Sequence, residues 1–154
     1  AMKRYYLAYG SNLNVRQMKY RCPTAKIVGT AVIRDYELLY KGSKTGSYLT
    51  IEKKKGSLVP VAVWEVTATD EHSLDIYEGY PNFYYKKNMK IRLSKTGKTV
   101  DAFVYIMHEE RRLGIPTSAY VSTCKYGYTI FGFDFKYLDE AYEKSLKGAS
   151  NNEN

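Results

Sequence analysis

Alternating apolar and polar positions, bounded by glycine and polar clusters, divide much of the chain into strands. The pattern predicts six strand segments, at residues 4–9, 26–42, 47–53, 58–66, 83–94 and 99–107. Gly29 is expected to mark a bulge or bend in the second segment. The third and fourth segments are expected to pair as a hairpin around Lys55-Gly56, and the last two around residues 95–98.

Helical spacing of apolar residues appears between and after these strands. We expect helices at residues 14–21, from Thr69 onward, and at 117–131 and 134–147. Thr69 is expected to cap the second helix, with Asp70 and Glu71 in its first turn, and Gly79 with Pro81 should end it. A strand-rich body with segregated helices predicts the α+β class.

The length and composition of the chain predict one globular domain. The 154 residues are 44% hydrophobic and 26% charged, which is enough to bury a core. We expect the domain to span residues 1–147 and to be followed by a polar, flexible tail at 148–154. No apolar run approaches the roughly 18 residues of a membrane span, so no membrane partner is expected. Cys22 and Cys124 lie far apart and are interpreted as free thiols, and without an apparent secretory signal we expect a cytoplasmic protein.

The net charge of +8 raises the question of a nucleic-acid partner. The basic residues are spread out, with a cluster at Lys53-Lys54-Lys55 and others along the strand pair 83–107, which favours the wet face of a sheet. The chain has 17 tyrosines against 5 phenylalanines, and these rings could stack on bases. Most of them fall at half-buried strand or helix positions, which favours packing. We therefore expect no nucleic-acid partner.

Metal and cofactor chemistry find little support in the sequence. His72 and His108 stand at no ligand spacing with another histidine or cysteine, so no metal site is predicted. Phosphate-binding and dinucleotide-binding glycine patterns are absent from the sequence, so no cofactor is predicted.

The first stretch that could carry chemistry is Tyr9-Gly10-Ser11-Asn12-Leu13, after the first strand. Gly10 permits a sharp or left-handed turn and a close approach of backbone to a ligand. The side chains of Ser11, Asn12 or Asn14 can cap the helix that follows. The first N–H groups of that helix have no partner within the helix and would attract a carboxylate or a developing oxyanion. Taken alone, the stretch favours a simple strand-to-helix turn.

The second stretch, residues 74–81, places Glu78 at the end of a predicted helix. The helix dipole, the nearby Asp75 and burial among tyrosines would all raise the pKa of Glu78. A carboxyl with a pKa nearer neutrality suits a general acid/base. The alternative is a solvated acid paired with Lys86 or Lys87, and the residues favour neither interpretation.

Taken together, these stretches and the C-terminal part resemble the gamma-glutamylcyclotransferase-like family, from about Tyr5 to Leu146. The resemblance rests on Tyr-Gly-Ser-Asn-Leu, on Leu-Asp-x-x-Glu-Gly-x-Pro followed by Tyr84, and on Pro116-x-x-x-Tyr120, Cys124-x-x-Gly127, Gly132 and Lys136-Tyr137-Leu138. It implies a small mixed β-barrel flanked by helices, with a cavity at the Gly10–Leu13 turn. It also implies release of 5-oxoproline from a small gamma-glutamyl amine or amide, without cofactor or metal.

The resemblance also implies roles for individual residues. Glu78 matches the catalytic glutamate of the family. The matches to its substrate-holding loop are Tyr9, Gly10, Ser11, Asn12 and Leu13, and the matches to its cavity tyrosines are Tyr84 and Tyr120. Tyr85 competes with Tyr84, but strand neighbours face opposite sides, and the motif spacing favours Tyr84.

The chemistry of the substrate agrees with this resemblance. The alpha-amine of a gamma-glutamyl compound can attack its own gamma-carbonyl, so the protein need only hold the folded conformer and move a proton. The alternative function is a non-catalytic module of the same fold that binds a small molecule or an anionic partner. The presence of Glu78, a proton carrier that a binding module would not need, favours the enzyme.

Overall fold

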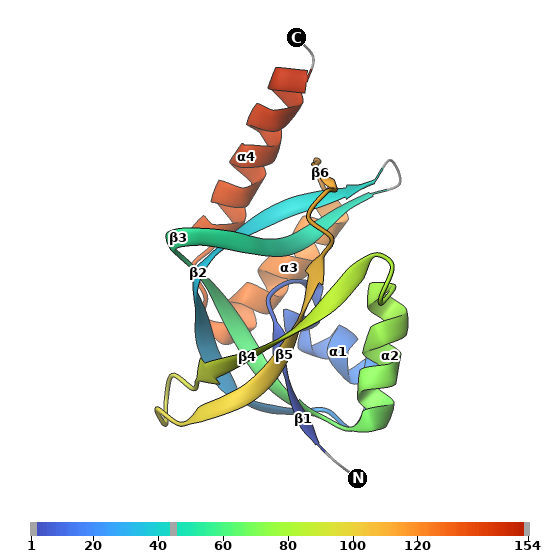
Figure 1. Ribbon diagram of the computed structural model, residues 1–154, viewed down its shortest axis with the longest axis vertical. Helices are drawn as coiled ribbons and strands as arrows, with labels where there is room; N and C mark the ends of the chain where they lie inside the picture. The colour runs from blue at the N-terminus through green and yellow to red at the C-terminus, as the bar shows by residue number, and fades with distance from the viewer. Residues whose placement is uncertain (1–2, 44–45, 153–154) are drawn as a thin grey trace.

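The computed structural model describes residues 3–43 and 46–152 of the chain (Figure 1). Over these residues the strands are β1 (Arg4–Ala8), β2 (Lys26–Ser43), β3 (Gly46–Val66), β4 (Tyr84–Arg92), β5 (Thr99–Met107) and β6 (Arg112–Leu113). The helices are a short 3₁₀-helix, η1 (Ser11–Leu13), and α1 (Val15–Arg21), α2 (Ala68–Glu78), α3 (Ser118–Phe131) and α4 (Lys136–Asn152).

The strands form one mixed sheet in the order β4-β5-β1-β3-β2-β6. The central strand β1 runs antiparallel to β3 and parallel to β5. The sheet curls so far that an antiparallel bridge joins Ala31 of β2 to Leu93, just beyond β4, and the Ser94 N–H donates to the Thr30 carbonyl at 2.9 Å. The predicted α+β class and the small curled barrel flanked by helices are therefore confirmed.

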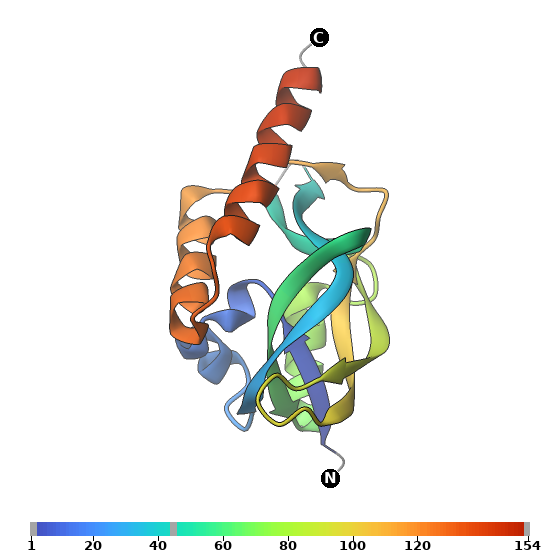
Figure 2. The same cartoon turned by 90° about the vertical axis from the view of Figure 1, so that its left-hand side faces the viewer.

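The hairpin predicted around Lys55-Gly56 is wrong. Residues 46–66 form one long strand that pairs along its length with β2, and the two strands bend together as a ribbon (Figure 2). At the bend, Gly56 has a φ of 87° and Asp35 a φ of 61°, and the Gly56 N–H donates to Asp35 Oδ1 at 2.9 Å. Both residue types tolerate the left-handed region, so the glycine that predicted a turn instead permits a bulge.

Other local predictions stand. The register between β2 and β3 shifts between Ile27 and Gly29, as expected for a bulge there. Strands β4 and β5 pair antiparallel as the predicted hairpin. Asn14 is the residue that caps α1, because its side chain accepts the Gln17 N–H at 3.1 Å.

Helix α2 starts earlier than predicted but ends where expected. Its cap is Thr67, not Thr69: the Thr67 hydroxyl accepts the Asp70 N–H, and the Asp70 carboxylate accepts the Thr67 N–H, which makes a reciprocal capping box. The helix ends at Gly79, whose φ of 64° is the left-handed conformation of a helix C-cap. Glu78 is therefore fixed as the last helical residue.

The last helix, α4, is longer than predicted. It continues past residue 147 to Asn152, and it rises beyond the sheet (Figure 1). Gly148 lies against β6, since a Cβ atom at Gly148 would be 3.2 Å from Leu113 Cδ1. Residues 153 and 154 of the predicted tail lie outside the described residues.

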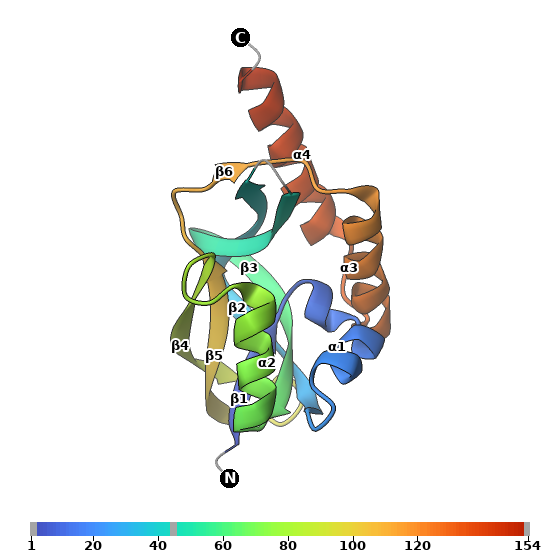
Figure 3. The same ribbon diagram turned by 90° about the vertical axis from the view of Figure 1, so that its right-hand side faces the viewer.

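The helices pack on two sides of the curled sheet. Helix α2 lies beside β1 and β5, whereas α1 and α3 lie together on the other side of η1 (Figure 3). Helix α3 approaches η1 closely at Gly127, where an added Cβ would lie 2.6 Å from the carbonyl carbon of Leu13. Only glycine permits this contact, which places α3 directly against η1. None of the described helices is long and apolar enough to cross a membrane.

Candidate active site

A cavity of about 430 Å³ opens between η1, the end of α2 and the inner side of the sheet. This volume falls in the range of small-molecule sites. Seven of the eight residues predicted for the site line it: Tyr9, Gly10, Ser11, Asn12, Glu78, Tyr84 and Tyr120. Residues from both halves of the chain are thus brought to one place.

Leu13 is the predicted site residue that does not line the cavity. It is fully buried and packs against Gly127 beneath η1, so it supports the loop from the core. Tyr84 and Tyr85 face opposite sides, as strand geometry requires. Tyr84 is buried in the cavity wall, whereas the Tyr85 hydroxyl donates to the Glu109 carboxylate.

The turn at Gly10 differs from the left-handed conformation considered for it. Gly10 has φ −129°, and a Cβ added there would lie 3.4 Å from the Tyr120 hydroxyl. The Ser11 and Asn12 side chains do not cap a helix but reach across the cavity wall. Ser11 Oγ lies 3.0 Å from the Tyr77 hydroxyl, and Asn12 Nδ2 donates to the Tyr6 hydroxyl at 2.8 Å.

Glu78 is half-buried in the cavity wall. Burial raises its pKa from the ordinary 4.5 to about 8, and the positive charge of Arg21 partly opposes this rise. Asp75 was expected to raise the pKa of Glu78 further, but it does not contribute to the shift. Its carboxylate instead binds Lys86 and the Tyr105 hydroxyl. The alternative interpretation, an ion pair of Glu78 with Lys86 or Lys87, is not found among the described residues, and Lys86 instead binds Asp75 at 2.8 Å. Glu78 is thus a carboxyl that is largely protonated at pH 7.

A polar network behind the cavity fixes α2 against the sheet. The Tyr105 hydroxyl donates to Asp75 Oδ1 at 2.6 Å, and Lys86 bridges Asp75 and Glu71. Arg4 completes the network with an ion pair to Glu71 at 2.7 Å. This network holds Tyr105, a wall residue, and the helix that carries Glu78.

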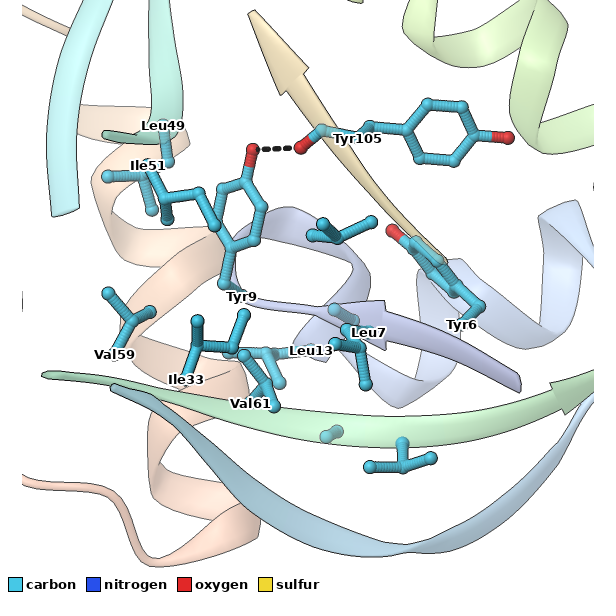
Figure 4. Close-up of a cluster of buried hydrophobic side chains, with 14 of the residues drawn as sticks. Tyr6, Leu7, Tyr9, Leu13, Ile33, Leu49, Ile51, Val59, Val61 and Tyr105 are labelled. Carbon is cyan, nitrogen blue, oxygen red and sulfur yellow. Dashed lines mark hydrogen bonds between the residues drawn. The ribbon is translucent and has the colours of Figure 1, made fainter. Parts of the chain in front are cut away.

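Backbone groups fix the tyrosines of the cavity. The Tyr9 hydroxyl donates to the Tyr105 carbonyl at 2.7 Å (Figure 4). The Tyr84 hydroxyl donates to the Leu49 carbonyl at 2.8 Å, and the Tyr120 hydroxyl accepts the Leu49 N–H at 3.0 Å. Burial raises the pKa of the tyrosines at positions 9, 84 and 120 well above the ordinary value, so they remain neutral.

Sequence reasoning missed several residues of the wall. Tyr6, Tyr48, Tyr77 and Tyr105 line the cavity and were not predicted. The excess of tyrosine was the available signal, because seven tyrosines of the described chain line this cavity. Arg21, whose charge acts on Glu78, was also missed, since a basic residue at a helix end is common.

Within the described residues, no group of three or more histidine, cysteine and acidic side chains is placed to hold a metal ion. His72 is exposed, and His108 Nε2 lies 2.7 Å from the Pro81 carbonyl oxygen. The cavity therefore offers one proton carrier, Glu78, and several hydroxyl groups.

The sequence and the fold are similar to known proteins. A family model described as "Gamma-glutamyl cyclotransferase, AIG2-like" matches residues 6–122. The human protein named gamma-glutamylcyclotransferase is 31% identical over an alignment of 110 residues that covers 66% of this chain and 58% of the human protein. A solved structure titled "Gamma-glutamyl cyclotransferase" superposes with a TM-score of 0.80 at 25% identity, covering 91% of this chain and 86% of the other. The solved structure of an uncharacterized human protein superposes with a TM-score of 0.80 at 26% identity, and the superposition covers 92% of this chain and 87% of the human one.

Proposed function

The chain belongs to the gamma-glutamyl cyclotransferase, AIG2-like family, and on that premise we propose that it releases 5-oxoproline from a small gamma-glutamyl amine or amide. The observation that carries the proposal is the position of Glu78. Its carboxyl lies in the wall of a cavity of suitable volume, and its pKa of about 8 lies near neutrality. A general acid/base works best when its pKa is close to the working pH.

The proposed reaction joins two parts of one substrate molecule. The neutral alpha-amine attacks the gamma-carbonyl carbon, a new C–N bond closes the five-membered ring, and the C–N bond to the leaving amine breaks. Glu78 in its ionised form takes the proton that the attacking amine loses and returns it to the leaving amine, so the carboxylate is regenerated. Ring closure is favoured because the cavity holds both reacting groups in one folded conformer.

The other predicted residues that line the cavity are assigned to substrate binding. We assign Gly10, Ser11 and Asn12 to the binding of substrate oxygen atoms, either its carboxylate or the carbonyl oxygen on which charge develops. The hydroxyls of Tyr84 and Tyr120 are hydrogen-bonded to the backbone of Leu49, and the two rings form one side of the cavity. No step of this scheme requires a metal ion or a cofactor.

The test is to incubate the protein with a panel of gamma-glutamyl amino acids, gamma-glutamyl amines and glutathione and to measure 5-oxoproline by mass spectrometry. We expect release from at least one compound. Glu78→Gln should reduce turnover by roughly 10²–10⁴-fold, the usual contribution of proton transfer, while binding persists. A protein that binds such compounds without product, or a Gln variant with the normal rate, would refute the proposal. The first of these results would favour the binding module.

A further inference from the structure

Arg21, the last residue of α1, makes contacts that a surface arginine at a helix end does not need. Its guanidinium carbon lies 3.4 Å from the centre of the Tyr77 ring on α2. Its Nη1 donates to Asn12 Oδ1 in the cavity loop. Since Ser11 also contacts the Tyr77 hydroxyl, Arg21 closes a ring of contacts that joins the loop to the last turn of α2.

The contact between Arg21 and Asn12 fixes the direction of the Asn12 amide. A guanidinium carries only donors, so the amide must present its oxygen to Arg21 and its NH₂ group to the other side. On that other side, Asn12 Nδ2 donates to the Tyr6 hydroxyl at 2.8 Å. The Tyr6 oxygen is thereby an acceptor, and its own proton is available for a group in the cavity that Tyr6 and Glu78 both line.

Arg21 is also the charged member of the groups that act on Glu78. The ionisable side chains that interact with its carboxyl come from five elements: Arg21 of α1, Tyr6 and Tyr9 near β1, Tyr84 of β4, Tyr105 of β5 and Tyr120 of α3. Burial raises the pKa of all five tyrosines, so they are neutral at the pH at which Glu78 titrates. Among these six side chains, Arg21 is therefore the one that carries a charge when Glu78 titrates.

We propose that Arg21 is a positioning residue of the cyclotransferase site: it orients the Asn12 amide and through it the Tyr6 hydroxyl, and it holds a fixed positive charge beside Glu78. This proposal rests on the proposed function. An arginine suits the place because its planar group can lie on the Tyr77 ring and donate in its own plane at the same time, whereas a lysine ammonium cannot do both.

The charge of Arg21 can be tested without any substrate. The carboxyl of Glu78 is followed by NMR in protein labelled with ¹³C-glutamate, with its signal assigned by loss in Glu78→Gln. Arg21→Met removes the charge and keeps an apolar stem over Tyr77, and Arg21→Gln is a second neutral variant. We expect the Glu78 midpoint to rise by about one pH unit in either variant, the lower end of the effect of a nearby opposite charge. Arg21→Lys and a matched control on the same helix, the exposed Arg16→Met, should leave the midpoint within a few tenths.

Kinetics test the orientation of Asn12 and Tyr6. In Arg21→Lys the charge remains but the fixed amide is lost, so we expect kcat to fall at least about tenfold at a pH above the Glu78 midpoint, with Arg16→Met at the wild-type rate. An unchanged Glu78 midpoint in both neutral variants, or a wild-type kcat in Arg21→Lys, would overturn the role of Arg21 while the enzyme remains active. If the wild type releases no 5-oxoproline from any compound, the proposed function fails, and the titration still decides whether Arg21 acts on Glu78.

Discussion

Replacing Glu78 by glutamine should make the folded protein more stable in alkaline solution, although it should also remove most of the turnover. The pKa of Glu78 is about 8 in the folded state and near 4.5 when the residue is fully solvated. A group whose pKa is raised by folding stabilises the protein fully below its unfolded pKa, and this contribution is lost as the pH rises through the folded value. Glutamine has no such titration.

The size of the effect follows from these two values. Each pH unit between them changes the free energy of unfolding by about 1.4 kcal/mol, so the full difference is at most about 5 kcal/mol. Because Glu78 is half-buried beside a cavity that solvent can enter, screening reduces the effect, and we expect about 2 kcal/mol. In a chain of this length, that corresponds to roughly 4–8 °C in Tm.

Urea unfolding at pH 4.5, 6, 8 and 9 gives the comparison. The free-energy difference between Glu78→Gln and wild type should grow from pH 4.5 to pH 8 and then level off. Glu140→Gln, which changes an exposed glutamate of α4, is the matched control and should show no such growth. A difference between Glu78→Gln and wild type that is constant from pH 4.5 to pH 9 would refute the reasoning, because it would mean that folding leaves the Glu78 carboxyl fully solvated.

Three further predictions concern turnover and packing. Turnover should decline as the pH falls below about 8, because protonated Glu78 cannot accept the amine proton; a kcat that is flat from pH 9 to pH 6 would contradict this. Chelators and iodoacetamide should leave the rate unchanged, since the described residues contain no cluster of three or more histidine, cysteine and acidic side chains that could hold a metal ion, and burial raises the pKa of the Cys22 and Cys124 thiols to about 12; inactivation by a chelator that zinc reverses would count against it. Gly127→Ala should lower stability in urea by about 1–3 kcal/mol, because its methyl group would meet Leu13; a wild-type midpoint would show that α3 can move away.

The sequence predicted correctly those parts of the fold that depend on residues close together in the chain. The stop of α2 at Gly79 and the β4–β5 turn depend on residues within a few positions of each other, and both were predicted correctly. The division of β3 at Gly56 was wrong because a left-handed glycine serves a turn and a bulge equally well. The choice between them depends on Asp35, more than twenty positions away, and on the pairing of β2 with β3.

The same distinction applies to the site. Glu78 and the loop at Gly10 could be located from motifs, because their local sequence is distinctive. Tyr6 and Tyr105 could not, because their placement in the wall depends on the parallel pairing of β1 with β5 and on the curl of the sheet. Arg21 gains its place only when α1 and α2 pack together, and no pattern along the chain records that contact.

The contact between Gly127 and Leu13 has a consequence for the order in which the molecule assembles. During synthesis, the cavity loop leaves the ribosome more than one hundred residues before α3 does. Until α3 docks, Leu13 lacks its contact with the backbone of Gly127, and the Leu49 N–H lacks its hydrogen bond to the Tyr120 hydroxyl. A nascent chain therefore carries the glutamate and the loop long before it carries a formed cavity. Acquisition of ligand affinity should therefore mark the docking of α3.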